Sequence, residues 1–412
     1  MIFAIENFFR KVFGIKIPFA FEYYSTRMML AAITSMMICI FLGPRFIKKL
    51  YELKIGQTIR TEDCPLLGQL HEKKKDTPTM GGALILFSML VSMFLWMDLQ
   101  NVFTLILFIT TVVLGGLGAR DDYLKLKYKN TKGISGKKKI LVQAGLGALL
   151  ALYLLCPPFT EMAHSGNWFP VPIVKELVGK NKPMQDEVDS VSPMQKTVSL
   201  KEYASRIYIP FFKDYAFSFS GVFFGFAFFF IICVVAGSSN AVNLTDGLDG
   251  LAAGCLIMVA SCLALIAFIS NNIDLARYLN ILYIEGSGEI AIYLSAFVGA
   301  CIGFLWYNGY PAQVFMGDTG SLALGGLIGV SAVLLKREFL LAVIGGIFVA
   351  EALSVILQVG SYKLRNKKRI FLCAPLHHHF EYKGWPETKV VIRFWIVGLL
   401  LAIIGLVSLK FQ

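Results

Sequence analysis

The stretch from Leu251 to Ser270, "LAAGCLIMVASCLALIAFIS", runs for twenty residues without a charged side chain. At about 1.5 Å of rise per residue, a helix of this length covers the roughly 30 Å hydrocarbon core of a bilayer. A segment in lipid must satisfy its own backbone hydrogen bonds, and a helix does so internally. The stretch therefore predicts a membrane-spanning helix.

Similar apolar runs recur along the chain, and none alternates with the period of two that barrel strands show. The sequence has 412 residues, of which 56% are hydrophobic and 16% charged, whereas soluble proteins carry about 25% charged residues. We expect an all-α, polytopic membrane protein that forms a single integral-membrane domain over residues 1–412. The expected spans, about ten, lie near 25–44, 79–97, 102–119, 140–157, 216–237, 251–270, 289–307, 319–335, 339–361 and 390–409.

The basic residues are unevenly distributed between the two sides of the expected bundle. Of 39 Lys and Arg residues, 24 lie in the loops 45–75, 120–139 and 363–393, which share one face. The positive-inside rule makes this face cytoplasmic, and ten spans then place both termini outside. The net charge of +12 thus has a membrane explanation, and no aromatic–basic pattern indicates a nucleic-acid partner. An insertion at 158–215 lies on the opposite, extracytoplasmic face and is expected to be a partly flexible surface loop.

Two polar motifs stand at the cytoplasmic ends of early spans. In "KKKDTPTMGG" (73–82), Lys74 and Thr79 precede a helix start, which suits an anion; the alternative is a basic patch with an ordinary turn. In "GARDDYLK" (118–125), Asp121 and Asp122 are adjacent carboxylates beside lipid, followed by Lys125. Such groups are costly near lipid unless they bind a metal, a base or a substrate, although an exposed helix end is also possible.

Two further motifs carry carboxylates and amides. "GSSNAVNLTDGLDGLAAG" (237–254) contains no Lys or Arg, and its polar residues recur every third position, at Asn240, Asn243, Asp246 and Asp249. This oxygen-rich pattern suits Mg²⁺ or a ribose and base. "WYNGYPAQVFMGDTGS" (306–321) offers Asn308, the ring of Phe315, and Asp318, which is either a helix cap or a metal ligand.

Three of the five histidines stand together in "APLHHHFEYKGWPE" (374–387), as His377, His378 and His379. Consecutive residues cannot all face one point on a helix, so we expect a loop with divergent roles for the three rings. Zinc would need a second His or Cys cluster, and the eight cysteines show no CxxC spacing. Phosphate contact or loop structure is the favoured role. Inside one span, Glu351 and Gln358 are expected to bond neighbouring helices.

All of these motifs gather on one membrane face. Carboxylates, lysines and histidines together predict Mg²⁺-dependent transfer of a phosphorylated group to or from a substrate embedded in lipid. A Walker A motif is absent from the sequence, so ATP hydrolysis is not indicated.

The motifs "TPTMGG", "ARDDYLK", "NAVNLTDGLDGLA", "FMGDTGS" and "PLHHHFEYKGW", in this order, resemble those of the phospho-N-acetylmuramoyl-pentapeptide-transferases. These enzymes belong to the polyprenyl-phosphate N-acetylhexosamine-1-phosphate transferases. The resemblance covers residues 25 to 409. It implies transfer from UDP-MurNAc-pentapeptide to undecaprenyl phosphate, giving lipid I and UMP. It also implies Mg²⁺, a homodimer and a location in the bacterial inner membrane, where the reaction begins the membrane stage of peptidoglycan synthesis.

The resemblance also assigns roles to residues. Asp318 would bind Mg²⁺. Asp121 and Asp122 match the paired aspartates of the family, for which both base catalysis and positioning are open. Phe315 would stack on uracil, with Asn308 and Asp249 bonding the nucleoside. The remaining assigned residues would contact phosphates or sugar or shape the same pocket; they are Lys74, Thr79, Lys125, Asn240, Asn243, Asp246, His377, His378 and His379, with His378 also counted as catalytic.

Two other functions compete with this one. A UDP-GlcNAc-using transferase would keep the fold and change the donor, although the triple-histidine motif favours the pentapeptide donor. A transporter would use intramembrane acids such as Glu351. Transporters place such groups near the midplane and show internal repeats, and neither pattern is evident in this sequence.

Overall fold

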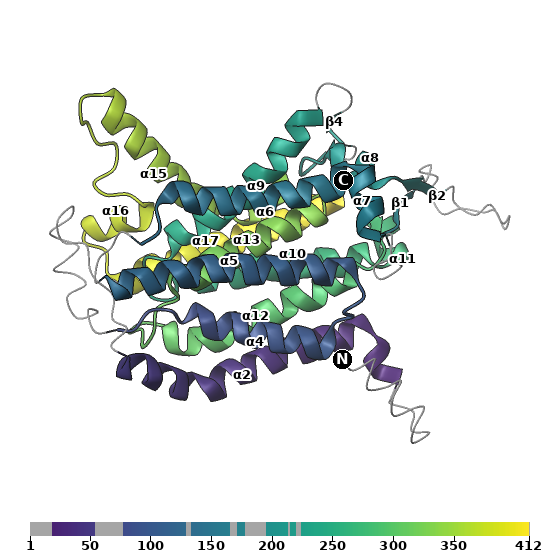
Figure 1. Ribbon diagram of the computed structural model, residues 1–412. Helices are drawn as coiled ribbons and strands as arrows, with labels where there is room; N and C mark the ends of the chain where they lie inside the picture. The colour runs from purple at the N-terminus through teal and green to yellow at the C-terminus, as the bar shows by residue number, and fades with distance from the viewer. Residues whose placement is uncertain are drawn as a thin grey trace, which may run out of the picture.

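The computed structural model describes residues 19–53, 77–128, 133–164, 171–177, 195–212, 215–219 and 224–411. Within them, nine helices are long and apolar enough to cross a membrane. They form a bundle (Figure 1) and are α2 (Tyr24–Glu52), α5 (Val102–Lys127), α6 (Gly136–Leu155), α9 (Phe224–Thr245), α10 (Leu251–Ser270), α12 (Gly288–Asn308), α13 (Gly317–Leu334), α15 (Gly346–Leu364) and α17 (Glu387–Ser408).

Shorter helices complete the bundle and its two ends. The predicted span at 79–97 corresponds to α4, a 15-residue apolar helix. The short helices are η1 (Phe19–Glu22), α4 (Gly82–Trp96), α7 (Pro157–His164), α8 (Leu200–Ser205), α11 (Ile273–Tyr278), α14 (Glu338–Ile344), α16 (Leu376–Tyr382) and η4 (Leu409–Phe411).

Two predicted spans differ from the structure. The span expected at 216–237 is wrong in position, because α9 begins at Phe224 and continues to Thr245. Its polar end stays helical since Ser239 donates to the carbonyl of Leu322 at 2.7 Å and Asn240 to that of Ala236 at 2.7 Å. The span expected at 339–361 is divided at Gly345 into α14 and α15.

α13 is the most enclosed of the long helices, with 89% of its apolar window buried. It packs against α4, α5 and α9, while α12 packs against α2, α4 and α10. Small residues allow this: a Cβ at Gly325 would lie 2.7 Å from the carbonyl oxygen of Ser238 on α9. A helix held this closely on several sides is a rigid support for whatever its ends carry.

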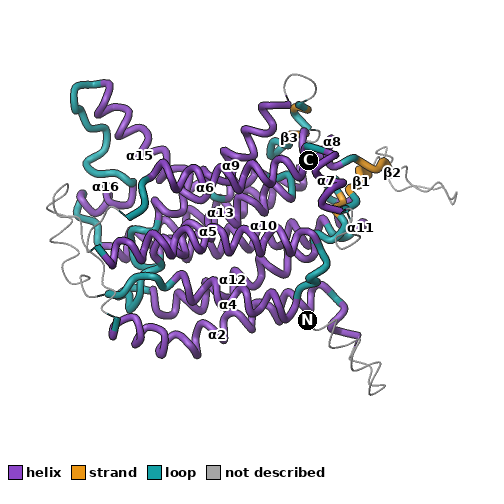
Figure 2. The backbone as a smooth tube through the Cα atoms, in the orientation of Figure 1, coloured by secondary structure: helices purple, strands orange, loops and turns teal. Residues whose placement is uncertain are grey.

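The strands lie at one end of the bundle (Figure 2). β1 (Val174–Leu177) pairs antiparallel with β2 (Gln195–Val198), and also with β5 (Tyr283–Ile284), which gives the order β2-β1-β5. β3 (Arg206–Ile207) pairs antiparallel with β4 (Phe217–Ser218). The described parts of the insertion 158–215 thus include short helices and strands.

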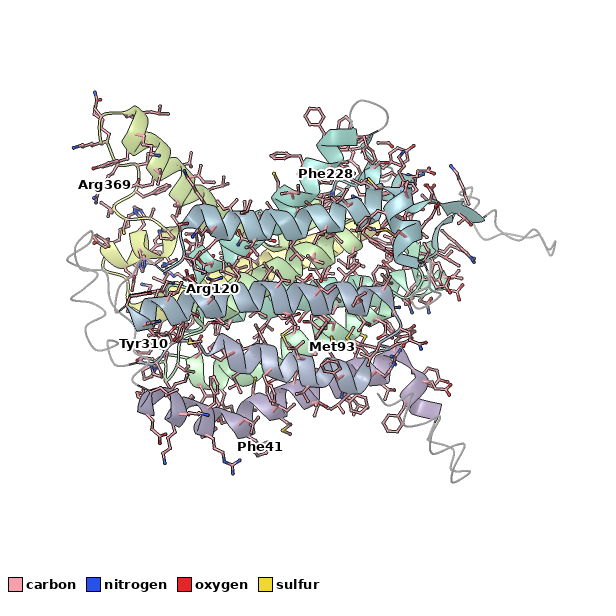
Figure 3. The ribbon with its side chains drawn as sticks, viewed as in Figure 1. Phe41, Met93, Arg120, Phe228, Tyr310 and Arg369 are labelled. Carbon is pink, nitrogen blue, oxygen red and sulfur yellow. The ribbon has the colours of Figure 1, made fainter. Side chains whose placement is uncertain are left out.

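The start of α2 and the end of α17 lie at this same end (Figure 1). Arg120, Tyr310 and Arg369 mark the opposite end (Figure 3). There α15 leans away from the other helices before the chain returns through α16 (Figure 1). The motif-bearing segments meet at this opposite end.

Candidate active site

Close glycine contacts bring three motifs together at the start of α13. A Cβ at Gly118 of α5 would lie 2.2 Å from the carbonyl oxygen of Asp318, and one at Gly82 of α4 would lie 2.1 Å from the nitrogen of Gly320. Gly317 has a φ of +72°, which favours glycine. The glycines of "TPTMGG", "GARDD" and "MGDTG" therefore serve close backbone approach.

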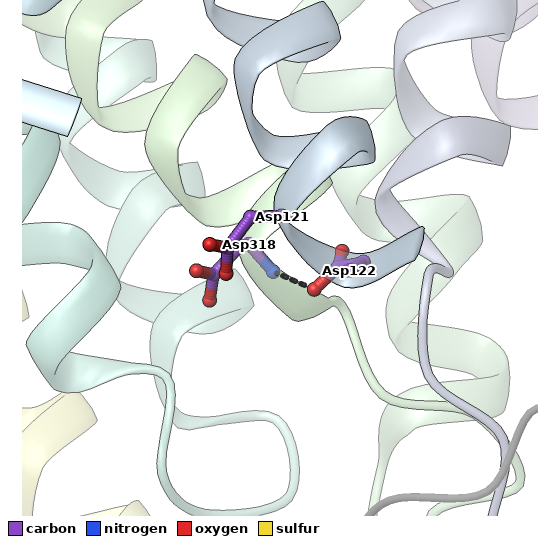
Figure 4. Close-up of side chains that lie close together, drawn as sticks. All are labelled: Asp121, Asp122 and Asp318. Atoms are coloured by element: carbon purple, nitrogen blue, oxygen red, sulfur yellow. Dashed lines mark hydrogen bonds between the residues drawn. The ribbon is translucent and has the colours of Figure 1, made fainter. Parts of the chain in front are cut away.

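Three carboxylates converge at this point (Figure 4). Asp121, Asp122 and Asp318 each offer an oxygen within 4.8 Å of the others. The side chains of Asp121 and Asp122 are buried, and that of Asp318 is 14% exposed. Hard oxygen ligands at this spacing suit Mg²⁺, which is bound by one or two carboxylates together with substrate phosphates.

Asp122 is committed to the backbone of α13. It accepts hydrogen bonds from the backbone N–H of Asp318 at 3.2 Å, from that of Thr319 at 2.9 Å, and from the Thr319 hydroxyl at 2.7 Å. A carboxylate at a helix N-terminus satisfies otherwise unpaired N–H groups and favours the helix dipole. Asp122 thus joins α5 to α13 and fixes where Asp318 stands.

Asp121 and Asp318 share two lysines. Lys125 Nζ lies 2.7 Å from Asp121 Oδ2 and 3.0 Å from Asp318 Oδ2, and Lys139 Nζ lies 2.9 and 2.5 Å from the same two oxygens. Asp121 Oδ1 also accepts the backbone N–H of Ile134 at 2.6 Å. Within the described residues, two ammonium groups therefore face three carboxylates, which leaves an excess of negative charge for a divalent cation.

The polar residues of "NAVNLTDGLDG" surround Asp318 in part. Asn243 donates to Asp318 Oδ1 at 3.0 Å and to the Ser321 hydroxyl at 2.8 Å. Asp246 follows the end of α9, where removal from water and the carboxylates of Asp318 and Asp122 raise its pKa to about 7. Asn243 and Asp246 thus belong to the acidic site.

Three other predicted residues are engaged by the protein itself. Asn240 donates to Gln143 of α6 at 2.7 Å. Asn308 is buried, donates to the carbonyl of Val314 at 2.9 Å and accepts from the Gly250 N–H at 3.1 Å. Asp249 is buried and accepts from the Ala312 N–H at 3.0 Å. Asn308 and Asp249 thus hold the loop 309–316 in shape, whereas Asn240 joins α9 to α6.

Thr79 and Phe315 stand on paired backbone segments. The N–H of Phe315 donates to the carbonyl of Pro78, and that of Gly81 donates to the carbonyl of Phe315, both at 2.8 Å. A Cβ at Gly317 would lie 2.7 Å from the Thr79 hydroxyl. Thr79 thus adjoins the acidic site. Phe315 is half-buried and lies three residues before Asp318 in the sequence. Lys74 lies outside the described residues.

The loop expected for the three histidines is wrong, because they open the short helix α16. Successive side chains on a helix diverge by about 100°, so the expected divergence still holds. His377 is fully buried, and a Cβ at Gly247 would lie 2.3 Å from its Nε2. His378 Nδ1 lies 2.7 Å from Glu381 Oε2, and His379 Nδ1 accepts the N–H of Leu372 at 3.1 Å.

Glu351 and Gln358 bond this returning segment rather than neighbouring membrane helices. Glu351 accepts the N–H groups of Leu376 at 2.7 Å and His377 at 3.1 Å, and its Oε1 lies 3.2 Å from His377 Nδ1. Gln358 accepts the N–H of Phe371 at 2.9 Å and donates to its carbonyl at 3.0 Å. Glu351 and Gln358 of α15 therefore anchor α16, here named the histidine helix, and the segment that precedes it. His377 of this helix contacts Gly247, the residue after Asp246.

Sequence reasoning missed Lys139 and the anchoring role of Glu351. Lys137, Lys138 and Lys139 open α6, and nothing in three consecutive lysines marks the last one. The signal was Gln143, a polar residue within an apolar run and one turn after Lys139. Residues four apart share a helix face, so a buried Gln143 directs Lys139 inward.

Comparisons with known proteins show the family to which the chain belongs. The glycosyl transferase family 4 model matches residues 184–336, and a phospho-N-acetylmuramoyl-pentapeptide-transferase signature matches 74–86. Proteins named phospho-N-acetylmuramoyl-pentapeptide-transferase are similar over nearly all of both chains. That of Protochlamydia amoebophila (strain UWE25) is 68% identical over 100% of each chain, and that of Methylacidiphilum infernorum (isolate V4) is 46% identical over 95% of each. The chain belongs to the phospho-N-acetylmuramoyl-pentapeptide-transferase family.

Proposed function

We propose that this chain transfers phospho-MurNAc-pentapeptide from UDP-MurNAc-pentapeptide to undecaprenyl phosphate in the bacterial inner membrane. A bond forms between an oxygen of the lipid phosphate and the phosphorus that carries the sugar, and the bond from that phosphorus to UMP breaks. The products are lipid I and UMP. The observation that carries the proposal is the cluster of Asp121, Asp122 and Asp318 at one end of a membrane bundle, in a chain 68% identical to a named transferase.

The donor set fits Mg²⁺. The three carboxylates lie within 4.8 Å of one another, and Asp318 keeps an exposed edge through which a diphosphate can approach. Asp318 would be the principal ligand, with Asp121 beside it. When bound, Mg²⁺ would neutralise charge on the diphosphate oxygens.

Lys125 and Lys139 would bind phosphate. Both ammonium groups now contact the oxygens of Asp121 and Asp318. A divalent cation bound by these carboxylates would free the two ammonium groups to contact phosphate oxygens. Preorganised positive charge at these oxygens stabilises the transition state. Thr79 adjoins the same point and would add a hydroxyl donor.

Asp121 and Asp122 position groups in this proposal rather than acting as bases. The second pKa of a phosphate monoester is about 6, so the lipid phosphate is largely ionised near neutral pH. Asp122 already accepts three hydrogen bonds from the start of α13. Asn243 in turn orients Asp318 through its Oδ1.

The remaining residues would shape the donor site. Phe315 would stack on the uracil, supported by a loop that Asp249 and Asn308 hold in place. His378, which is partly exposed, would contact the diphosphate or sugar. Buried His377 would act through position, because its ring lies against Gly247 and Glu351. The homodimer and the extracytoplasmic termini stay predictions.

The experiment is UMP release by the purified protein in detergent with undecaprenyl phosphate. UDP-MurNAc-pentapeptide or UDP-GlcNAc is supplied as donor, each with and without Mg²⁺. Among these four conditions, we expect UMP release only when UDP-MurNAc-pentapeptide and Mg²⁺ are both present. Release with UDP-GlcNAc in its place would preserve the transfer chemistry and overturn the proposed donor; release without Mg²⁺ would overturn the metal requirement.

A further inference from the structure

An aromatic surface stands at the end of the bundle opposite the acidic site. Strands β3 and β4 pair Arg206 with Ser218 and Ile207 with Phe217, and the described residues 206–212 and 215–219 are here named the aromatic hairpin. Its described side chains include Phe212, 63% exposed, and Phe217, 64% exposed. Exposed aromatic groups of this size in one short segment mark an interaction surface rather than ordinary surface scatter.

The chain that leads into the hairpin is fixed to the bundle, which holds the start of β3 in place. The Tyr203 hydroxyl donates to the carbonyl of Leu334 at 2.5 Å, and Lys336 Nζ donates to that of Ala204 at 3.1 Å. Arg206, which is buried, donates to Glu202 at 2.6 Å and lies 4.6 Å from the centre of the Tyr215 ring. Phe212 and Phe217 therefore stand exposed on a hairpin whose base is anchored to the bundle.

The aromatic surface continues onto a membrane-spanning helix. The ring of Phe219 stacks on that of Phe226 of α9 at 6.5 Å between centroids. Phe226 and Phe229, three residues apart and so on one helix face, are 62% and 64% exposed. β4 lies beside the start of α9 (Figure 1). The exposed face of a spanning helix meets lipid, and the hairpin extends that face.

The basic residue Lys201 of α8 lies beside the start of α9. An apolar groove of about 490 Å³ is lined by Leu155, Phe159, Lys201 and Phe224, among others. Lys201 Nζ lies 5.1 Å from the centre of the Phe224 ring. An acyl chain matches such a groove, and an ammonium at its edge suits a lipid phosphate, because lysine side chains extend along apolar surface toward headgroups.

We propose that the aromatic hairpin is inserted in the headgroup and upper acyl region of the membrane leaflet at this end of the bundle. Aromatic side chains favour this interfacial layer over either water or the hydrocarbon centre. The partner is the lipid itself. Continuity with α9 favours lipid over a second protein chain.

The test introduces tryptophan by Phe212→Trp and, separately, Phe217→Trp in the full chain reconstituted in phosphatidylcholine nanodiscs. Lys196→Trp is the matched control, since this β2 side chain is 60% exposed and β2 lies at the same end of the bundle as the hairpin (Figure 2). The wild-type emission is subtracted from each. Quenching is then measured with lipid brominated near the headgroup end of its acyl chains, and with iodide in the water phase.

At both hairpin positions, we expect the emission of the added tryptophan to be blue-shifted, quenched by brominated lipid and unaffected by iodide. For Lys196→Trp, we expect quenching by iodide and none by brominated lipid. Quenching by iodide to the same extent as the control, with none from brominated lipid, would overturn the proposal. Protection from both quenchers would also overturn it, because a protein partner or a second copy would then cover the hairpin.

Discussion

Carboxylates and lysines lie at both ends of α13, but the numbers of negative and positive charges differ between the two ends. At its N-terminal end, three carboxylates face Lys125 and Lys139, and Asp318 is partly exposed. Beyond its C-terminal end, Lys336 pairs with Glu338 at 2.6 Å, and both side chains are buried. A matched, enclosed pair serves the fold. An unmatched, accessible cluster is available for a ligand.

The largest expected effect follows from removing the metal ligand. Asp318→Asn should lower the rate of UMP release by about 1,000-fold, because a neutral amide binds Mg²⁺ poorly and several kcal/mol of charge stabilisation are lost. The melting temperature should stay near that of the wild type. Near-normal turnover with unchanged Mg²⁺ dependence would remove Asp318 from the ligand set.

The matched pair should respond in stability instead. Lys336→Met removes the ammonium group that lies 2.6 Å from the buried Glu338 carboxylate and leaves only the charge of neighbouring Arg337. It should lower the free energy of unfolding by about 3–5 kcal/mol, measured by thermal denaturation in detergent. The double variant Lys336→Met/Glu338→Leu should regain most of that loss. If the single variant unfolded normally but released UMP slowly, the contrast between the two ends would fail.

At the N-terminal end of α13, substitution of Lys139 should lower the reaction rate, whereas substitution of its neighbour Lys138 should not. Lys139→Gln should reduce kcat by about 100-fold, the typical cost of removing one group that stabilises transition-state charge. Lys138→Gln is the control, because Lys138 is exposed on the same turn of α6. Equal activities of the two variants would exclude Lys139 from the site.

The smallest effect is expected from the anchor of the histidine helix. Glu351→Gln keeps one acceptor for the N–H groups of Leu376 and His377 and loses the other, so kcat/KM should fall about tenfold, or about 1.4 kcal/mol. Ser354→Ala is a nearby control on α15, since the Ser354 hydroxyl donates to the Glu351 carbonyl rather than to its side chain. A fall of the same size in both variants would indicate a general disturbance of α15.

Much of this comparison could be predicted from the sequence. Apolar runs indicate the spans, and charge asymmetry places the motifs at one end, so the meeting of Asp121, Asp122 and Asp318 was foreseeable. The extent of α9 was not, because hydropathy does not show that Asn240 and Ser239 find partners on α6, on α13 or in their own helix. Polar groups bonded within the bundle extend a helix beyond its apolar part.

The contacts missed by sequence reasoning depend on how the chain returns. Lys139 reaches the carboxylates only because α6 turns this side chain toward α5 and α13. Glu351 finds its partners only because the residues after α15 turn back toward Gly247. The family resemblance assigns Asn308 and Asp249 to the nucleoside, and it carries no information on their partners within this chain. Their buried bonds to Val314 and Ala312 emerge only from the folded loop.

The most direct test of the account is a titration of the purified protein with Mn²⁺, followed by the electron paramagnetic resonance signal of the unbound ion. Mn²⁺ prefers the same oxygen ligands as Mg²⁺. We expect a binding site for Mn²⁺ in the wild type and in Lys336→Met/Glu338→Leu, and none in Asp318→Asn. Equal binding by Asp318→Asn and the wild type would contradict the claim that the N-terminal end of α13 holds the metal.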